Sequence, residues 1–344
     1  MRVDAARAVA VDWVRQHARR DPGVRGAFFS GSTVSLSDDA VLPASSDVDV
    51  LLVRDEPGKL GKFRHDGVLL EVTALTWDDL GSPEDVLGSW VFAPSFRTDT
   101  LITDPTGRLA AIRERVSAGF ADPEWVRRRC GGVRRRIEDG LRVLDAAAPL
   151  HEQVTAWLFP TSLTAVLPVV AGLRDPTVRR RYVLAGQVLT EHRLAGRYPE
   201  LLDLLDGGGT GPERVREHLA GLAVTFDEAA RVARTRFFFS ADVRAAARPV
   251  VVDGAAELVA AGAHREAMFW VVATYARCHA ILAADAPERE AARRPWFLAA
   301  LADLGVSSAA DRRRRADAVL AWLPRGWSTA REVADAVRRR DVAR

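Results

Sequence analysis

Residues 26–53 read GAFFSGSTVSLSDDAVLPASSDVDVLLV, and they contain two apolar runs separated by a polar, turn-rich segment. The first run, residues 24–29, predicts a strand that ends at the turn containing Gly31 and Ser32. The second run, residues 47–53, is β-branched and apolar and predicts another strand with two acids at its start. This order of strand, Gly-Ser turn and acidic strand is the most specific pattern in the chain.

Asp47 and Asp49 are two residues apart on the predicted strand, so both carboxylates point to the same face of the sheet. Val48 and Val50 then point to the opposite face, toward the core. Paired carboxylates repel each other, and a divalent cation removes that repulsion. Magnesium prefers carboxylate oxygens together with substrate phosphates, so the pair indicates a magnesium site. On its own, an Asp-x-Asp pair is more often part of a solvated surface.

Glu71 is the only acid in the apolar run 68–75, which predicts a further strand. An isolated charge in an apolar environment is costly, so this carboxylate needs an ion partner, a metal or an edge position. If the strand lies beside the one with Asp47 and Asp49, Glu71 completes a cluster of three carboxylates. Such a cluster can hold two metal ions and support in-line attack at phosphorus. A single glutamate in a strand is more often an edge residue.

Gly31 and Ser32 lie where the first strand ends, and residues 33–37 are expected to begin a helix. The free N–H groups and the positive dipole end of a helix N-terminus favour phosphate. Glycine lets the backbone approach a ligand closely, and the serine hydroxyl can donate a further hydrogen bond. The alternative reading of this dipeptide is an ordinary turn.

The run 46–53 and the order of these motifs resemble the nucleotidyltransferase motif of the DNA polymerase beta superfamily. In that superfamily a strand, a Gly-Ser turn and an Asp-x-Asp strand follow in this order, and a third acid lies on a later strand. With its helical C-terminal part, the chain is similar to antibiotic nucleotidyltransferases. The gap between Ser32 and Asp47 is longer here than in compact members, and residues 38–43 are expected to form a loop near the site.

The resemblance implies a role for each site residue. Gly31 and Ser32 would bind the triphosphate of an NTP, and Asp47 and Asp49 would hold two magnesium ions. Glu71 would bind the metal that lowers the pKa of an acceptor hydroxyl. That hydroxyl would attack the α-phosphorus, and pyrophosphate would leave. The expected acceptor is a small molecule, aminoglycoside-like or another natural product.

Two other functions stay open at this point. The first is nucleotidyl transfer to RNA, such as tRNA, or to a protein, as in toxin-type relatives. Arginine runs at 127–129, 134–136, 179–181, 312–315 and 338–340 would suit an RNA-binding face, but acids are nearly as numerous, so solvated helix faces are favoured. The second is a non-catalytic nucleotide-binding or antitoxin-like module. The preferred NTP and the oligomeric state also stay open.

The chain is expected to be an α+β protein. Residues 1–108 would form a small mixed-sheet nucleotidyltransferase domain, and residues 109–344 would form a larger all-α domain that binds the acceptor. In the first domain we expect a helix at 3–20, a turn at 55–61 and a last strand at 100–103. In the second, Pro324-Arg325-Gly326 is expected to separate two helices.

Composition predicts a cytoplasmic protein with no membrane partner. Hydrophobic residues make up 48% of the chain, charged residues 28%, and the net charge is +3. No uninterrupted apolar run reaches the ~20 residues that span a bilayer. The charged N-terminal segment is typical of an amphipathic helix and not of a signal peptide.

Three weaker signals lie in the helical part. Some antibiotic nucleotidyltransferases take a general base or acceptor contacts from their helical part, and by that resemblance Glu266 is the candidate here. The favoured reading is that an acid in the first turn of a helix stabilises the dipole, and the general base stays open. Residues 157–162, with Pro160, could line an acceptor pocket, but a helix break is the simpler reading. The aromatic run 237–239 could stack a base, while core packing is the favoured interpretation.

Overall fold

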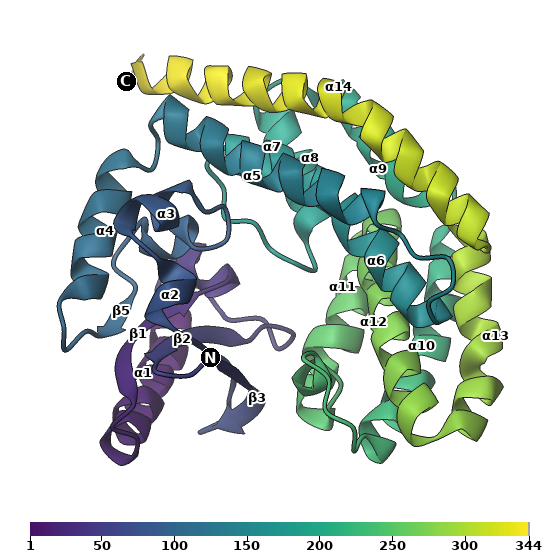
Figure 1. Cartoon of the computed structure of the whole chain (residues 1–344), viewed down its shortest axis with the longest axis horizontal. Coiled ribbons are helices and arrows are strands. Elements are labelled where there is room, and N and C mark those ends of the chain that lie inside the picture. The colour runs from purple at the N-terminus through teal and green to yellow at the C-terminus, as the bar shows by residue number, and fades with distance from the viewer. Residues whose placement is uncertain (343–344) are drawn as a thin grey trace. The chain divides into compact units, whose positions relative to one another are not determined.

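The computed structural model describes residues 1–342, and these residues form two compact units that divide after Arg129 (Figure 1). The boundary at residue 108 expected from the sequence is therefore wrong. Helix α4 (Arg108–Gly119) packs against α3 (Pro83–Gly88) and the 3-10 turn η2 (Ala93–Phe96), all in the first unit. Strand patterns end at residue 108, but a helix belongs to the unit against which its apolar face is buried.

The first unit is built around one five-stranded mixed sheet in the order β3-β4-β2-β1-β5. Its strands are β1 (Val24–Ser30), β2 (Val48–Arg54), β3 (Gly58–His65), β4 (Val68–Leu75) and β5 (Leu101–Thr103). Strands β2 and β4 are parallel, and the other neighbouring pairs are antiparallel. The expected α+β class, with a small mixed sheet followed by a larger helical part, is confirmed.

We expected a turn at residues 55–61, but the bend covers only residues 55–56, and strand β3 begins at Gly58. It forms a hairpin with β4, and the two-residue connection is Asp66-Gly67, with φ angles of 46° and 82°. Positive φ at both positions is typical of the tight turn that matches strand twist, and Asp-Gly is a strong signal for it. The sequence therefore contained the evidence for this strand.

Helix α1 (Val3–Arg20) packs on one face of the sheet, as expected for residues 3–20. Its buried residues form a core cluster with the inward-facing residues of the central strands. Members of this cluster are Ala6, Ala10, Val14, Val48, Val50, Leu52, Leu70 and Val72. Side chains alternate across a strand, so the residues between these valines and leucines lie on the opposite face. The short helices α2 (Trp77–Leu80) and α3 follow β4, each with a capping box.

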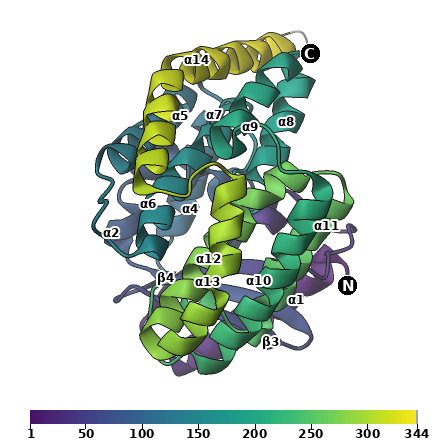
Figure 2. The same ribbon diagram turned by 90° about the vertical axis from the view of Figure 1, so that its right-hand side faces the viewer.

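The second unit contains only helices and their connections in its described residues, 130–342, with no strand. It begins within α5 (Pro123–Arg142). The helices that follow are α6 (Leu150–Ser162), α7 (Val166–Ala171), α8 (Arg181–Glu191), α9 (Tyr198–Asp206), α10 (Pro212–Val232), α11 (Gly254–Ala260), α12 (His264–Asp285), α13 (Pro287–Asp303) and α14 (Ala309–Val342). Helix α12 packs against α10, α6 and α13, and Figure 2 shows α10, α12 and α13 together. This unit is a bundle arranged around α12.

Two segments of this bundle, Leu150–Ala171 and His264–Asp285, are long and apolar enough to cross a membrane. Most of each segment is buried inside the structure, 78% and 83% of its most apolar window. The apolar residues of both segments are therefore used in the core of the helical unit. This is the arrangement of core helices.

Helix α14 is continuous, so the break predicted at Pro324 is wrong. Buried residues lie on both sides of the proline, Trp322 and Leu323 before it and Val333 after it. Burial of this continuous apolar stripe outweighs the hydrogen bond that the proline removes. Figure 1 shows α14 bending along its length. Pro160 lies inside α6 in the same way, without ending that helix.

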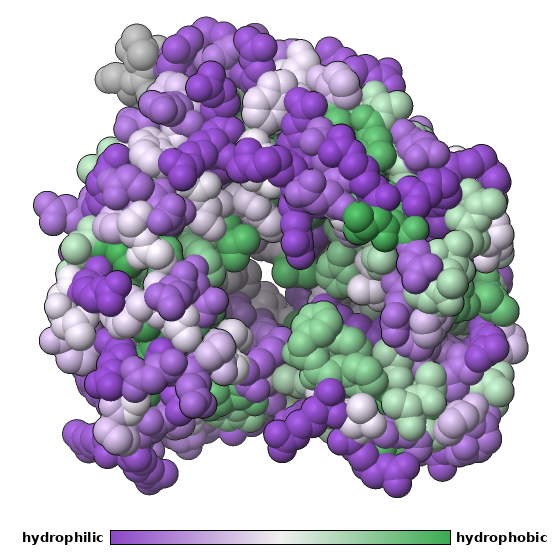
Figure 3. Space-filling model, viewed as in Figure 1, coloured by the Kyte–Doolittle hydropathy of each residue, from purple (hydrophilic) through white to green (hydrophobic). Residues whose placement is uncertain are grey.

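The arginine runs are not all solvated. Arg338, Arg339 and Arg340 are exposed, and most of the surface in Figure 3 is hydrophilic. Arg129 and Arg312 are buried, at 1% and 4% exposure. Each guanidinium donates to backbone carbonyls, Arg129 to Leu87 and Arg312 to Val306, so these arginines are structural.

Replacing Arg129 is expected to destabilise the first unit. Its guanidinium donates to the carbonyls of Leu87 and Phe120 and lies over the Phe120 ring. Arg129→Met leaves these buried acceptors without a donor, and we expect a loss of about 3 kcal/mol in the free energy of unfolding. Urea denaturation measures the change. Arg128→Met is the matched control, because the exposed Arg128 should contribute under about 0.5 kcal/mol.

Candidate active site

Four polar side chains form one row across the sheet. Ser30 on β1 pairs with Asp49 on β2, Asp49 pairs with Glu71 on β4, and Glu71 pairs with Lys62 on β3. Residues that pair directly in neighbouring strands point to the same face. The row therefore lies on the face opposite α1, and Asp47 joins it from the residue just before β2.

The three acids predicted from the sequence come together in the structure. One carboxylate oxygen from each of Asp47, Asp49 and Glu71 lies within 4.8 Å of the others. The side chains of Asp47 and Glu71 are mostly buried, with 12% and 19% of their surface exposed. Three half-desolvated carboxylates at this spacing require cationic partners. We refer to these three residues as the carboxylate triad.

Gly31 lies directly against the triad. Its φ angle is 69°, a conformation that favours glycine. A Cβ placed on it would lie 2.5 Å from Cγ of Asp49 and would overlap the carboxylate. The backbone at Gly31 therefore lies so close to the Asp49 carboxylate that no residue with a Cβ would fit in its place.

The helix expected after Gly31 is only a 3-10 turn, η1 (Ser32–Ser35). One turn aligns few peptide dipoles, so it does not provide the helix N-terminus that we expected for phosphate. Ser32 is half-buried at the start of this turn. Binding of phosphate by Gly31 and Ser32 stays a prediction that rests on the close backbone approach.

Two lysines that the sequence analysis did not assign to the site belong to it. Lys62 Nζ contacts the carboxylates of both Asp47 and Glu71, and Lys59 Nζ lies 2.8 Å from Oε1 of Glu71. Lys62 is buried, whereas the Lys59 side chain is 28% exposed. They are the only lysines in a chain otherwise rich in arginine. Two features of the sequence could have assigned these lysines to the site. One is their rarity, and the other is the Asp66-Gly67 turn, which places β3 beside β4.

The charges of the site divide unequally. Burial alone would raise the pKa of Glu71, but the Lys62 and Lys59 ammonium groups outweigh it and lower the pKa to about 2. The pKa of Lys62, which burial would lower, is raised by Asp47 and Glu71. Burial raises the pKa of Asp49 well above its usual value, and the Asp47 and Glu71 carboxylates raise it further. Asp49 is therefore the acid without a direct ion pair in the described part of the chain.

The segment between Ser32 and Asp47 is held against α1 by hydrogen bonds and an ion pair. Backbone N–H groups of Val3 and Asp4 donate to the carbonyls of Ala40 and Asp38, and Arg7 forms an ion pair with Asp38. The expected loop at 38–43 is thus fastened to the start of α1. Its attachment explains how the chain accommodates the added length between Ser32 and Asp47.

Glu266 lies in the other unit, in the first turn of α12. Its Oε1 accepts a hydrogen bond from Tyr198 Oη at 2.7 Å. Burial and the Glu266 charge together raise the pKa of Tyr198, so this phenol stays protonated and remains a donor. The contact gives Glu266 a structural partner, and its role as a general base stays a prediction.

We expect Glu266→Gln to lower the rate of nucleotidyl transfer by less than threefold, because glutamine still accepts the Tyr198 hydrogen bond. A general base would instead contribute about 10²–10⁴-fold. Steady-state pyrophosphate release distinguishes the two results. A hundredfold loss in a variant with unchanged thermal stability would restore Glu266 as the base.

The two aromatic segments differ from the favoured readings. Phe238 is 80% exposed and Phe237 and Phe239 are half-buried, so core packing is wrong for this run. It lies in an irregular segment after α10, where the chain has no helix periodicity to direct all three rings inward. Thr161 and Ser162 are fully buried, and Ser162 Oγ accepts a hydrogen bond from Arg181. The segment 157–162 is therefore part of the core of the bundle.

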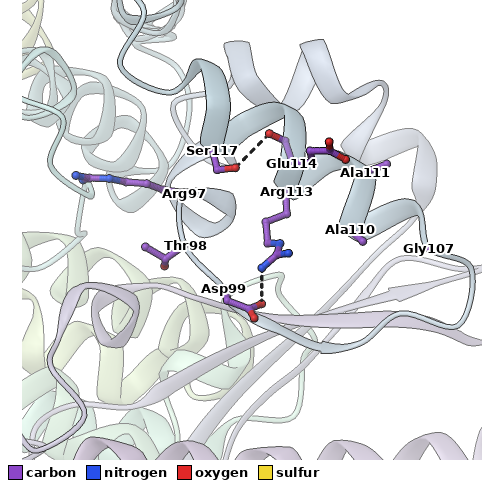
Figure 4. Close-up of a pocket in the computed structure, with 9 residues that line it drawn as sticks. All are labelled: Arg97, Thr98, Asp99, Gly107, Ala110, Ala111, Arg113, Glu114 and Ser117. Carbon is purple, nitrogen blue, oxygen red and sulfur yellow. Dashed lines mark hydrogen bonds and ion pairs between the residues drawn. The ribbon is translucent and has the colours of Figure 1, made fainter.

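A surface cavity of about 600 Å³ lies elsewhere in the first unit, between α4 and the segment before β5 (Figure 4). Its walls include Arg113 and Asp99, which form an ion pair at 3.2 Å. None of the residues that line it belongs to the carboxylate triad. In the described residues, a buried ammonium group and several carboxylates converge at the triad and not at this cavity.

Comparisons of the whole chain assign it to no family. No protein-family model matches the sequence, and no curated protein matches it either. A function must therefore be argued from the residues of the site.

Proposed function

We propose that this protein is a magnesium-dependent nucleotidyltransferase. It would transfer a nucleoside monophosphate from an NTP to a hydroxyl of a small-molecule acceptor and release pyrophosphate. The observation that carries the proposal is the carboxylate triad on the face of the sheet opposite α1, with Gly31 against Asp49. The order of these residues along the chain, which resembles the polymerase beta superfamily motif, supports the same chemistry.

The donor set suits magnesium. Asp47, Asp49 and Glu71 supply only carboxylate oxygens, the ligands that magnesium prefers. Three carboxylates and two lysines leave a formal charge of −3 + 2 = −1, and Asp49 makes no ion pair in residues 1–342. The triad would hold the metal, which would supply positive charge to the phosphates and to the acceptor oxygen.

The other residues act on the triphosphate. Gly31 has no side chain, so phosphate oxygens can approach the backbone beside Asp49. Lys59 and Lys62 provide two ammonium groups at the triad, and these can compensate charge on the nucleotide and on the leaving pyrophosphate. Ser32 adds a hydroxyl donor at the same turn.

The acceptor class is inferred from the resemblance to antibiotic nucleotidyltransferases, whose helical part binds the acceptor. We propose the same use for the helical unit and a cytoplasmic location, where NTPs are available. Exposed arginines on α14 keep RNA as an alternative acceptor. A panel of aminoglycosides, other hydroxyl compounds and tRNA, assayed for pyrophosphate release, would separate these acceptors.

One observation favours a non-catalytic module as the second candidate. Lys62 already forms ion pairs with two of the three carboxylates, as an internal counter-ion would in a site that binds no metal. Such a module would not bind NTP in a magnesium-dependent manner.

The deciding experiment is calorimetry of a non-hydrolysable NTP with and without magnesium. Wild type is compared with the Asp47→Asn/Asp49→Asn double variant. Magnesium-dependent binding that the double variant lacks supports the enzyme. If neither protein binds any NTP in the presence of magnesium, the enzyme proposal is wrong and the module is the better account.

A further inference from the structure

Lys62 lies inside the carboxylate triad and not at its rim. Its ammonium contacts two different acids that come from two different strands, and the side chain is 6% exposed. Lys59 Nζ lies 2.8 Å from Oε1 of Glu71, and its side chain is more exposed, at 28%. Lys62 is therefore the residue whose charge is placed where a metal ion would be coordinated.

A metal ion and this ammonium need the same carboxylates. Asp47 Oδ2 and Glu71 Oε2 both face Lys62 Nζ, and both acids belong to the triad. Two cations on one pair of carboxylates repel each other. Metal entry therefore requires the ammonium to withdraw from at least one acid, which the flexible four-carbon stem of lysine permits.

An ammonium that leaves two carboxylates needs another anion nearby, since a buried charge without a partner is costly. On the proposed function, the anion that arrives at this site is the triphosphate. We propose that Lys62 couples the two ligands: it opposes metal binding while the site holds no nucleotide, and it binds the triphosphate once the metal has displaced it. This inference rests on the proposed function.

The coupling has a thermodynamic consequence. The metal alone displaces Lys62 without a compensating partner, so its affinity is reduced. With triphosphate present the displaced ammonium is paired again, so each ligand raises the affinity for the other by the same factor. Typical couplings of this kind are about 5- to 150-fold.

The test compares wild type with Lys62→Gln in the full-length protein. Mn²⁺ replaces magnesium because free Mn²⁺ is followed by its electron paramagnetic resonance signal. For the metal alone, we expect Lys62→Gln to bind Mn²⁺ about tenfold more tightly than wild type. We then expect a non-hydrolysable ATP or GTP analogue to bind wild type at least about tenfold more tightly when Mn²⁺ saturates the site. In Lys62→Gln this effect of Mn²⁺ should be reduced to about threefold or less.

Arg64→Gln is the matched control. It removes one positive charge from the same strand, but Arg64 is exposed and donates only to the carbonyl of Gly67. Its Mn²⁺ affinity should stay within about twofold of wild type. Lys62→Arg keeps the charge and covers the case in which the glutamine variant folds poorly, and it should show no gain in Mn²⁺ affinity.

Three results would overturn the inference. Unchanged Mn²⁺ affinity in a folded Lys62→Gln protein shows that the lysine does not compete with the metal. Equal coupling in wild type and variant shows that the lysine does not link the ligands. If neither protein binds triphosphate, the coupling and the proposed function fall together. The titration with Mn²⁺ alone still decides whether Lys62 opposes the metal, so the two failures are distinguishable.

Discussion

Asp49→Asn should abolish nucleotidyl transfer, with a loss of about 10³-fold or more, and still make the metal-free protein more stable. The substitution removes a carboxylate that would hold the metal. It also removes a half-buried carboxylate that makes no direct ion pair in residues 1–342 and lies beside two other carboxylates. We expect a gain of about 1–3 kcal/mol in the free energy of unfolding. Function and stability thus make opposite demands on this position.

The pH dependence of that gain follows from the raised pKa of Asp49. Below its unfolded-state pKa of about 4 the acid is protonated in both states, so wild type and variant differ little. As the pH rises through the unfolded-state pKa and toward the raised folded-state pKa, wild type loses stability relative to the variant. Urea denaturation in EDTA at pH 5 and pH 8 should show a larger gain at pH 8.

Asp47→Asn is the matched comparison because it removes a partner of the Lys62 ammonium. It should lower the free energy of unfolding by about 1–3 kcal/mol, the opposite sign, while activity is also lost. Two isosteric changes in one triad with opposite effects on stability would identify Asp49 as the uncompensated acid. A loss of stability in both variants would contradict that assignment.

Gly31→Ala should lower kcat/KM by about 10²-fold or more. The alanine Cβ would overlap the Asp49 carboxylate, and the φ angle of 69° adds backbone strain of about 1–2 kcal/mol. Relief of the overlap moves either the turn or the acid, and small displacements in a catalytic site cost rate steeply. Pyrophosphate release with a fixed acceptor measures the effect.

Gly107→Ala is a control with positive φ and no overlap. Gly107 has a φ of 71°, close to that of Gly31, but its ψ is 0° and that of Gly31 is −160°, and its Cβ would meet nothing within 4 Å. The left-handed region at Gly107 strains alanine less than the conformation of Gly31 does, so Gly107→Ala should lose less stability and keep its activity. Equal loss of activity in both variants would refute the argument that the close approach to Asp49 matters.

Local patterns in the sequence predicted the centre of the site well. Asp47 and Asp49 fall on one face because strand periodicity is strict, and β-branched neighbours make the strand unambiguous. Glu71 joins them because β2 and β4 are adjacent and in register. The sequence predicted this cluster only on the condition that the two strands are neighbours. Strand order depends on tertiary packing, and the spacing of residues along the chain does not reveal it.

The missed parts have different causes. Lys62 was overlooked because we expected a turn at residues 55–61 and no strand before residue 68, although Asp66-Gly67 indicated a hairpin. The 3-10 turn at Ser32–Ser35 and the continuity of α14 through Pro324 depend on surrounding packing that outweighs local propensity. Phe238 was expected in the core and is exposed. An aromatic residue in a segment without helix or strand periodicity gives no indication of whether it is buried.

The hairpin of β3 and β4 also has a consequence for the order of folding. Lys62 and Glu71 are joined through the two-residue Asp66-Gly67 turn, so their pairing closes a very short loop. The pairing of β2 with β4 brings in Asp47 and Asp49 across a much longer loop and is entropically slower. The hairpin of β3 and β4 can therefore form first. When β2 then pairs with β4, the Lys62 ammonium already lies beside Glu71, where Asp47 and Asp49 join the site. In this sequence of events the nascent chain never has to assemble three bare carboxylates against their mutual repulsion.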